Sequence, residues 1–133
     1  MTSKNSGPAD LPKKIHHTVS QYVSLLGTGT ADDIAALYAV EGTLEDPVGS
    51  EPRRGRENIR AFYSKMDGTS STADLLTVRV AGNSAAFHFR VATTTADAVI
   101  TIEPIDVMTF DDEGLITSMR AFWSPNDVNT VPL

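Results

Sequence analysis

Apolar residues recur with the period of a helix in the first half of the chain and with the period of a strand in the second half. The first set has the spacing of one helix face: Ile15, Val19, Tyr22, Val23 and Leu26. This spacing predicts a helix that begins near Asp10 and ends at Gly27, because glycine is a typical C-terminal cap residue.

Two shorter helices are predicted to follow. Thr30 is a candidate N-cap, and two aspartates come next in the first turn, where the helix dipole favours acidic side chains. The inner face of this second helix is expected to consist of Ile34, Leu37 and Tyr38. A third helix is predicted over residues 56–65, whose apolar residues also share one side.

Alternation of apolar and polar residues begins after Asp74 and predicts strands. The first strand has its apolar residues at every second position: Leu76, Val78 and Val80. Gly82-Asn83 is a turn signal, and the next strand repeats the alternation: Phe87, Phe89 and Val91.

Two further strands are predicted over residues 99–110 and 115–123, separated by an acidic turn at 111–114. The tail from Ser124 contains two prolines and is expected to be irregular. Helices followed by four strands with short turns indicate an α+β fold, with the helices packed on one face of an antiparallel sheet.

Composition excludes several classes of function. The length of 133 residues fits one domain, predicted at 10–133 behind a flexible N-terminal tail at 1–9. A net charge of −6 argues against binding to nucleic acid or anionic membranes, and the absence of cysteine excludes disulfides and thiolate metal sites. The chain has no apolar run of membrane-spanning length and shows no signal peptide, so we expect a cytoplasmic protein.

Asp106 is an acidic residue on a strand face that is otherwise apolar. Unpaired buried carboxylates are rare, and burial raises the pKa of a carboxyl group. One interpretation is therefore a neutral acid that donates a hydrogen bond. The alternatives are a change of strand face at Pro104 or a salt-bridged residue at a sheet edge, and the pattern alone leaves them open.

Tyr22 and Asp46 are two further polar candidates. Tyr22 lies on the apolar stripe of the first helix, where an ordinary core tyrosine is the simpler interpretation. Asp46 precedes Pro47, which favours an extended residue that ends a strand and opens a loop. Functional groups often lie on such loops, although Asp-Pro is also a common way to begin a turn.

Other candidates have weaker support. His16 and His17 are adjacent and point to different helix faces, and His88 is alone, so the histidines do not have metal-ligand spacing. The arginines at 53, 54, 56 and 60 form a local cluster that fits a solvated helix start or an anion site. No serine has a histidine and an aspartate placed for a hydrolase triad.

The polar candidates belong to a set of segments that together match a known family. Six segments occur in the family's order: QYVSLL at 21–26, IAALYA at 34–39, TLEDPVGSEP at 43–52, IRAFY at 59–63, EPID at 103–106 and SMRAFW at 118–123. Through them the chain from about Thr18 to Trp123 resembles the bacterial ketosteroid isomerases, also called steroid delta-isomerases. The segment at 43–52 is the most specific.

The resemblance implies a role for each polar candidate. Asp46 matches the general base, Tyr22 matches the oxyanion-hole tyrosine, and Asp106 matches a protonated aspartic acid in the same oxyanion hole. Ketosteroid isomerases are themselves the established example of a carboxylic acid kept neutral by an apolar site. Tyr38 and Tyr63 match tyrosines that form a hydrogen-bond network behind the catalytic tyrosine.

The resemblance also carries expectations about the fold, pocket and assembly. It implies the cone-shaped α+β fold of the nuclear-transport-factor-2-like superfamily, with a curved mixed sheet on three helices. Trp123 matches an aromatic position that lines the steroid pocket, and we expect Phe89 and Met108 to add apolar surface. The family uses no metal or organic cofactor, and its members are homodimers.

The function implied by the resemblance is steroid isomerisation, in which the double bond of a 3-oxo-Δ5-steroid moves into conjugation with the ketone. One alternative is a binding module of the same fold that holds a steroid-like ligand without chemistry, since fold does not dictate function. Another is an epoxide hydrolase or polyketide cyclase on the same fold. The combination of Tyr22, Asp46 and Asp106 favours the isomerase.

Overall fold

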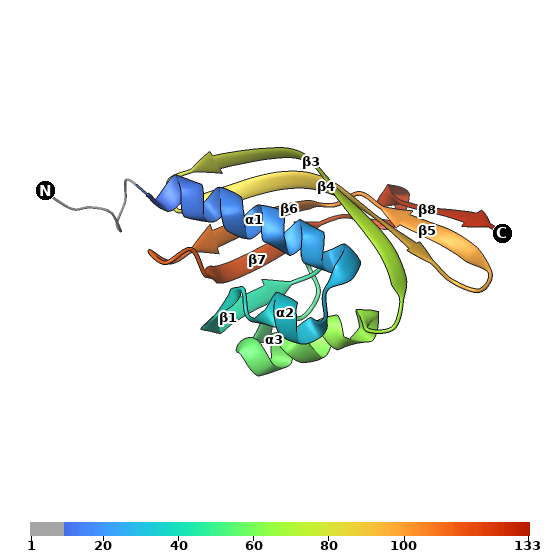
Figure 1. The fold of residues 1–133 in the computed structure, drawn as a ribbon, viewed down its shortest axis with the longest axis horizontal. Coiled ribbons are helices and arrows are strands. Elements are labelled where there is room, and N and C mark those ends of the chain that lie inside the picture. Colours follow the sequence, from blue (N-terminus) through green and yellow to red (C-terminus); the bar gives the residue numbers. More distant parts are fainter. Residues whose placement is uncertain (1–9) are drawn as a thin grey trace, which may run out of the picture.

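The structure is a computed structural model that describes residues 10–133, so the tail predicted at 1–9 lies outside the described residues. Helices lie along the concave side of a curved sheet (Figure 1). The helical elements are α1 (Leu11–Thr28), α2 (Ala31–Ala35), α3 (Arg56–Tyr63) and the 3-10 turns η1 (Ser64–Met66) and η2 (Pro125–Asp127). The strands are β1 (Tyr38–Glu45), β2 (Arg53–Arg54), β3 (Ser70–Ala81), β4 (Ser84–Thr94), β5 (Ala98–Ile102), β6 (Ile105–Phe110), β7 (Ile116–Phe122) and β8 (Val128–Pro132). The expected α+β fold of a mixed curved sheet on three helices is confirmed.

The sheet is mixed rather than wholly antiparallel, which corrects the interpretation from hydrophobic pattern alone. The strand order is β2-β1-β7-β6-β4-β5-β8, and β3 pairs with the other edge of β4. All pairings are antiparallel except β1 with β7, which is parallel and sets Glu45 beside Arg120. This parallel pair matters for the site, because the C-terminal ends of β1 and β7 lie side by side.

The first two helices differ in detail from their prediction. Helix α1 continues past Gly27 to Thr28, and Gly29 is its cap residue. Thr30 caps α2 through a reciprocal capping box with Asp33, as its sequence indicates. Helix α2 ends at Ala35, however, so Tyr38 begins strand β1 instead of completing the inner face of a helix.

The long strand predicted over residues 99–110 is two strands, because the ladder is interrupted at Glu103-Pro104. Proline has no N–H to donate to a ladder. Both pieces still lie along the same edge of β4, with β5 opposite its second half and β6 opposite its first half. The alternation of inward and outward side chains continues across the break, so Pro104 and Asp106 are both buried.

Two other strand predictions need correction. A register shift between Leu75 and Thr77 turns Leu76 outward, where 40% of it is exposed, while Val78 and Val80 keep the inward phase. The tail after Ser124 is not irregular throughout, because η2 is followed by β8, which pairs with β5.

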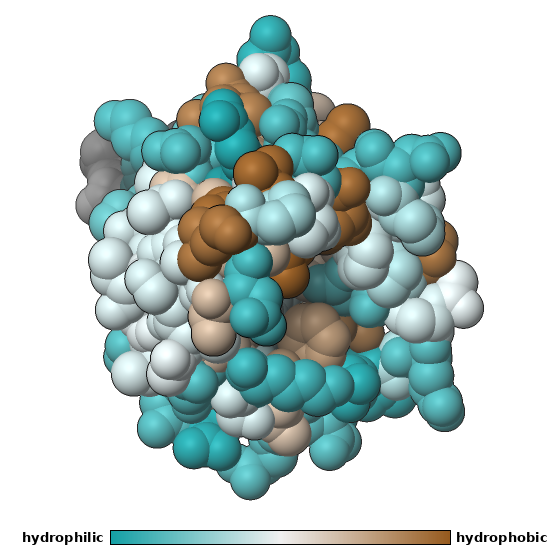
Figure 2. Space-filling model, turned by 90° about the vertical axis from the view of Figure 1, so that its right-hand side faces the viewer, coloured by the Kyte–Doolittle hydropathy of each residue, from teal (hydrophilic) through white to brown (hydrophobic). Residues whose placement is uncertain are grey.

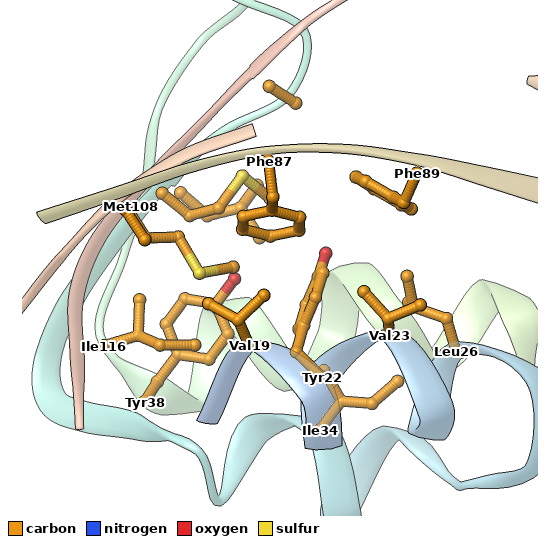
Figure 3. Packing of buried hydrophobic residues seen from close by; sticks show 14 of the residues in the cluster. Val19, Tyr22, Val23, Leu26, Ile34, Tyr38, Phe87, Phe89, Met108 and Ile116 are labelled. Atoms are coloured by element: carbon orange, nitrogen blue, oxygen red, sulfur yellow. The ribbon is translucent and has the colours of Figure 1, made fainter. Parts of the chain in front are cut away.

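The core lies between α1 and the concave face of the sheet (Figure 3). Val19, Tyr22 and Val23 of the helix face the two phenylalanines Phe87 and Phe89 of β4. Tyr38 and Met108 pack at one end of this layer and are fully buried. A polar side chain in this layer therefore has mostly hydrocarbon around it.

Candidate active site

A cavity of about 370 Å³ opens between the concave face of the sheet and the helices. Its lining combines apolar side chains with a few polar ones: Tyr22, Leu26, Asp46, Phe62, Tyr63, Lys65, Met66, Phe89, Val91, Thr93, Ile102, Pro104, Asp106 and Trp123. Figure 2 shows apolar residues gathered around a hollow at the end of the molecule that carries β5 and β8. The size and composition suit a rigid, mostly apolar small molecule.

Asp106 is the second residue of β6, and only 1% of it is exposed. Neither carboxyl oxygen has a hydrogen-bond partner among the described residues. Burial raises the pKa of Asp106 well above its usual value, and the nearby charge of Asp46 raises it further. The inward position expected for Asp106 is confirmed, and a neutral Asp106 has one O–H to donate into the cavity.

Tyr22 reaches the same cavity from α1, and its hydroxyl is the first of three tyrosine hydroxyls that lie in hydrogen-bond contact, each with the next. Its hydroxyl lies 3.0 Å from that of Tyr63, which lies 2.7 Å from that of Tyr38. Burial raises the pKa of all three phenols well above the usual value, so they stay protonated. If Tyr38 donates to Tyr63 and Tyr63 donates to Tyr22, the proton of Tyr22 is free to point into the cavity.

Aromatic edges fix the position of the Tyr22 ring. Its ring packs edge-on against Phe87 and Phe89, with centroid distances of 6.1 and 6.3 Å. Figure 3 shows its hydroxyl directed toward these two side chains of β4. Such contacts hold a donor in place before any ligand arrives.

Asp46 reaches the cavity from the end of β1. It follows the last residue of β1 and precedes Pro47 through a cis peptide bond. Trp123, which comes directly after β7, donates its indole N–H to Asp46 Oδ1 at 2.6 Å. Burial raises the pKa of Asp46, and the hydrogen bond from Trp123 opposes that rise by stabilising the carboxylate.

The structure brings together nearly all the residues singled out from the sequence. Tyr22, Asp46, Asp106, Phe89 and Trp123 line one cavity. Tyr63 lines it as well, and Tyr38 lies behind Tyr63.

Met108 is the exception. It is completely buried in the core beside Tyr38 and does not line the cavity. Met108 lies two residues after Asp106 on β6, and the cavity does not extend that far along the strand. Sequence reasoning also missed several lining residues: Leu26, Met66, Val91, Thr93, Ile102 and Pro104. Leu26, Val91 and Ile102 lie at inward-facing positions of their helix or strands. An inward-facing position does not tell whether a side chain lines a cavity or packs in the core.

The clusters set aside at the sequence level have structural partners. Arg60 forms an ion pair with Asp32, and Arg56 donates to the backbone carbonyl of Tyr38. His88 lies 3.0 Å from Glu103 on the outer side of the sheet. Within residues 10–133, no group of three or more metal-binding side chains is assembled, and no helix is long and apolar enough to cross a membrane.

Comparison with known proteins defines the family to which this fold and site belong. The model of the SnoaL-like domain family matches residues 19–119, so the chain belongs to that family. Within it, the chain is 47% identical over 119 residues to the Steroid Delta-isomerase of Nocardioides simplex. The match covers 90% of this chain and 97% of that protein, which confirms the resemblance found in the sequence.

Two more distant relatives have a different chemistry. The chain is 28% identical to the Epoxide hydrolase LasB of Streptomyces lasalocidi, with 96% of this chain aligned to 54% of that protein, about half its length. A solved structure of SalBIII, described as an epoxide hydrolase/cyclase-like enzyme in pyran ring formation of the polyether salinomycin, superposes with a TM-score of 0.81. It is 28% identical and covers 89% of this chain and 96% of its own.

Proposed function

We propose that this protein is a steroid delta-isomerase that moves the double bond of a 3-oxo-Δ5-steroid into conjugation by proton transfer through a dienolate. The observation that carries the proposal is the pairing of two unlike acids in one apolar cavity. Asp106 is buried without a partner, whereas Asp46 is only partly buried and accepts a hydrogen bond from an indole. The 47% identity to a steroid delta-isomerase supports the same conclusion.

Asp46 is the proposed general base. Its Oδ1 accepts the Trp123 N–H, which leaves Oδ2 free to take a proton from carbon four of the steroid. The C–H electron pair then forms the dienolate, with the charge on the ketone oxygen. Asp46 returns the same proton to carbon six, and the ketone and a conjugated double bond are formed. A carboxylate suits this task because it takes and returns one proton from a fixed position.

Tyr22 and Asp106 are the proposed donors to the dienolate oxygen. Both are buried, and burial favours the protonated form of each group. Donors held in place by packing stabilise the charge as it develops, without reorganising during the reaction. Tyr63 and Tyr38 support Tyr22 through the chain of hydroxyls.

The rest of the cavity is proposed to bind the steroid rings. Phe89, Val91 and Ile102 supply hydrocarbon along one wall, and Trp123 supplies an aromatic face beside the base. Burial of apolar surface contributes about 25 cal/mol per Å², so a ligand with few polar groups gains most of its affinity from this surface. No step of this mechanism uses a metal or an organic cofactor.

A second candidate is the opening of an epoxide, which the similarity to LasB and SalBIII favours. A third is ligand binding without chemistry. The trio of Tyr22, Asp46 and Asp106 separates the isomerase from a pure binder, because steroid binding alone requires neither a base nor a neutral carboxylic acid.

The test is a steady-state assay with a β,γ-unsaturated 3-ketosteroid, in which the conjugated enone is followed by its ultraviolet absorbance. Turnover by the wild-type protein supports the isomerase. Tight steroid binding in a thermal-shift assay without turnover supports the binding module and contradicts our proposal. Turnover of an epoxide in place of the ketosteroid supports the second candidate.

We also propose a homodimer. Ile105 of β6 and Phe122 of β7 are cross-strand partners on the outer face of the sheet, where 48% and 43% of them are exposed. Adjacent exposed apolar residues on a sheet face suit contact with a second copy of the chain. Light scattering after size-exclusion chromatography checks the mass, and a monomer at micromolar concentration contradicts this proposal.

A further inference from the structure

Strand β7 holds the loop that carries the proposed base at three points. Trp123 donates to the side chain of Asp46, and the backbone carbonyl of Ala121 accepts the N–H of Val48 at 2.8 Å. The third point is Arg120, whose Nε donates to Glu45 Oε1 at 3.1 Å. The loop after β1 is therefore anchored to its parallel neighbour.

Glu45 connects both ends of this loop. Its Oε1 accepts from Arg120, and its Oε2 accepts the backbone N–H of Gly49 at 2.9 Å. Gly49 has a φ of 104°, a conformation that side-chain-bearing residues rarely adopt. The carboxylate thus closes a ring around residues 45–49, with Asp46 inside it.

The charge on Glu45 fits this double role. The N–H of Gly49 lowers the pKa of Glu45, and Arg120 lowers it further. Glu45 is only partly exposed, whereas Arg120 is about half-exposed. A carboxylate that accepts from a backbone N–H and a guanidinium at once has its rotamer fixed by two charge-assisted bonds.

We infer that Glu45 is a positioning residue for the isomerisation: paired with Arg120 and bonded to Gly49, it fixes the backbone of the loop so that Asp46 reaches both carbon atoms of the steroid. This inference rests on the proposed function. It assigns no contact between Glu45 and the substrate, because Glu45 does not line the cavity. Displacement of a reacting group by about 1 Å costs up to about 10²-fold in rate, so a small change in the loop has a measurable effect.

The pair is well suited to substitution. The guanidinium of Arg120 is about half-exposed, and an ion pair with one member open to water adds little to folding stability, so removal of Glu45 is expected to leave the fold intact. The Asp32–Arg60 pair provides a control, because it is another carboxylate–guanidinium pair, with a more exposed carboxylate than Glu45, and lies on α2 and α3. Neither Asp32 nor Arg60 lines the cavity.

The experiment compares Glu45→Ala, Glu45→Gln and Asp32→Ala with the wild-type protein. We expect Glu45→Ala to lower kcat by about tenfold or more, with the dissociation constant of a phenolic steroid unchanged within about twofold. Glu45→Gln keeps an acceptor for the Gly49 N–H and is expected to recover most of kcat. Asp32→Ala is expected to retain the wild-type kcat.

An isotope measurement distinguishes a misplaced base from a damaged protein. With deuterium at carbon four of the substrate, a well-placed Asp46 delivers a fraction of the label to carbon six, and the remainder exchanges with water. We expect that fraction to fall in Glu45→Ala and to return in Glu45→Gln.

The inference is overturned if Glu45→Ala keeps the wild-type kcat, or if Asp32→Ala loses as much activity. It is also overturned if phenolic steroid binding weakens as much as kcat falls. Arg120→Met, which removes the pairing with Glu45 together with the cation–π contact on Phe122 but keeps the Glu45–Gly49 bond, is the second variant and is expected to fall between Glu45→Ala and the wild type. An absence of turnover in the wild-type protein would instead contradict the proposed function, which keeps the two failures distinct.

Discussion

The two carboxyl groups of the cavity occupy very different surroundings. Asp106 lies within a strand at the cavity wall, almost completely buried and without a hydrogen-bond partner. Asp46 lies where a strand becomes a loop, partly buried and bonded to an indole N–H. Burial raises the pKa of both groups, but only Asp46 has a donor that favours its charged form. The difference teaches that position in the fold, rather than residue type, sets the protonation preference on which the proposed role of each acid depends.

Substitution of Asp46 is the strongest test of this comparison. Asp46→Asn keeps the size of the side chain and an acceptor for Trp123 but removes the base. We expect kcat to fall by about 10²–10⁴-fold, which is the usual contribution of a general base. The enone assay measures the loss. Binding of a phenolic steroid is the control, and a wild-type kcat in Asp46→Asn would falsify the assigned base.

Substitution of Asp106 separates a neutral donor from a charged group. Asp106→Ala removes a donor to the dienolate oxygen and is expected to lower kcat by about 10²–10³-fold. Asp106→Asn retains an N–H donor, so it should lose less than Asp106→Ala. Both kcat values are measured above neutral pH. If Asp106→Asn is as impaired as Asp106→Ala, donation from position 106 is not what supports catalysis.

Two of the three polar residues were predictable because each breaks a local pattern. Asp106 interrupts an apolar period of two, and Asp46 combines a strand end with a following proline. Tyr22 was harder to predict, because a tyrosine on an apolar helix stripe is usually core, and only its place among the resembling segments distinguished it. The local pattern therefore identified Asp106 and Asp46 as candidate residues, whereas the catalytic role expected of each residue came from the family resemblance.

Features that depend on contacts between distant segments were not predictable from local pattern. The parallel pairing of β1 with β7 joins strands that are far apart in the chain, and nothing in either strand alone indicates it. Strand β8 begins three residues after Pro125 and gains its partner only from β5. Phe89 and Met108 share an inward phase on neighbouring strands, yet the cavity occupies only one end of the concave face and includes only Phe89.

Loss of the indole donor is expected to have a smaller effect than loss of either acid. Trp123→Phe keeps an aromatic wall and removes the hydrogen bond to Asp46. Hydrogen bonds to charged groups contribute about 1.5–3 kcal/mol, which sets an upper bound of about 10- to 10²-fold on the expected fall in kcat. That bond lowers the pKa of Asp46, so its loss raises the pKa further. The acid limb of the pH–rate profile should therefore move to higher pH, and an unmoved limb contradicts the role assigned to Trp123.

The smallest effect is expected at the far end of the phenol chain. Tyr63→Phe breaks both of its hydroxyl contacts, whereas Tyr38→Phe breaks one that does not involve Tyr22 directly. A neutral hydrogen bond contributes about 0.5–1.5 kcal/mol, so Tyr38→Phe should lower kcat by no more than about tenfold, and Tyr63→Phe by more. Tyr38 and Tyr63 support only Tyr22, the donor to the dienolate oxygen. Neither substitution should therefore move the acid limb of the pH–rate profile, which reports the pKa of Asp46. Steady-state rates across pH measure both effects, and a shifted limb in Tyr38→Phe would show that the surroundings of the two carboxyl groups are not independent.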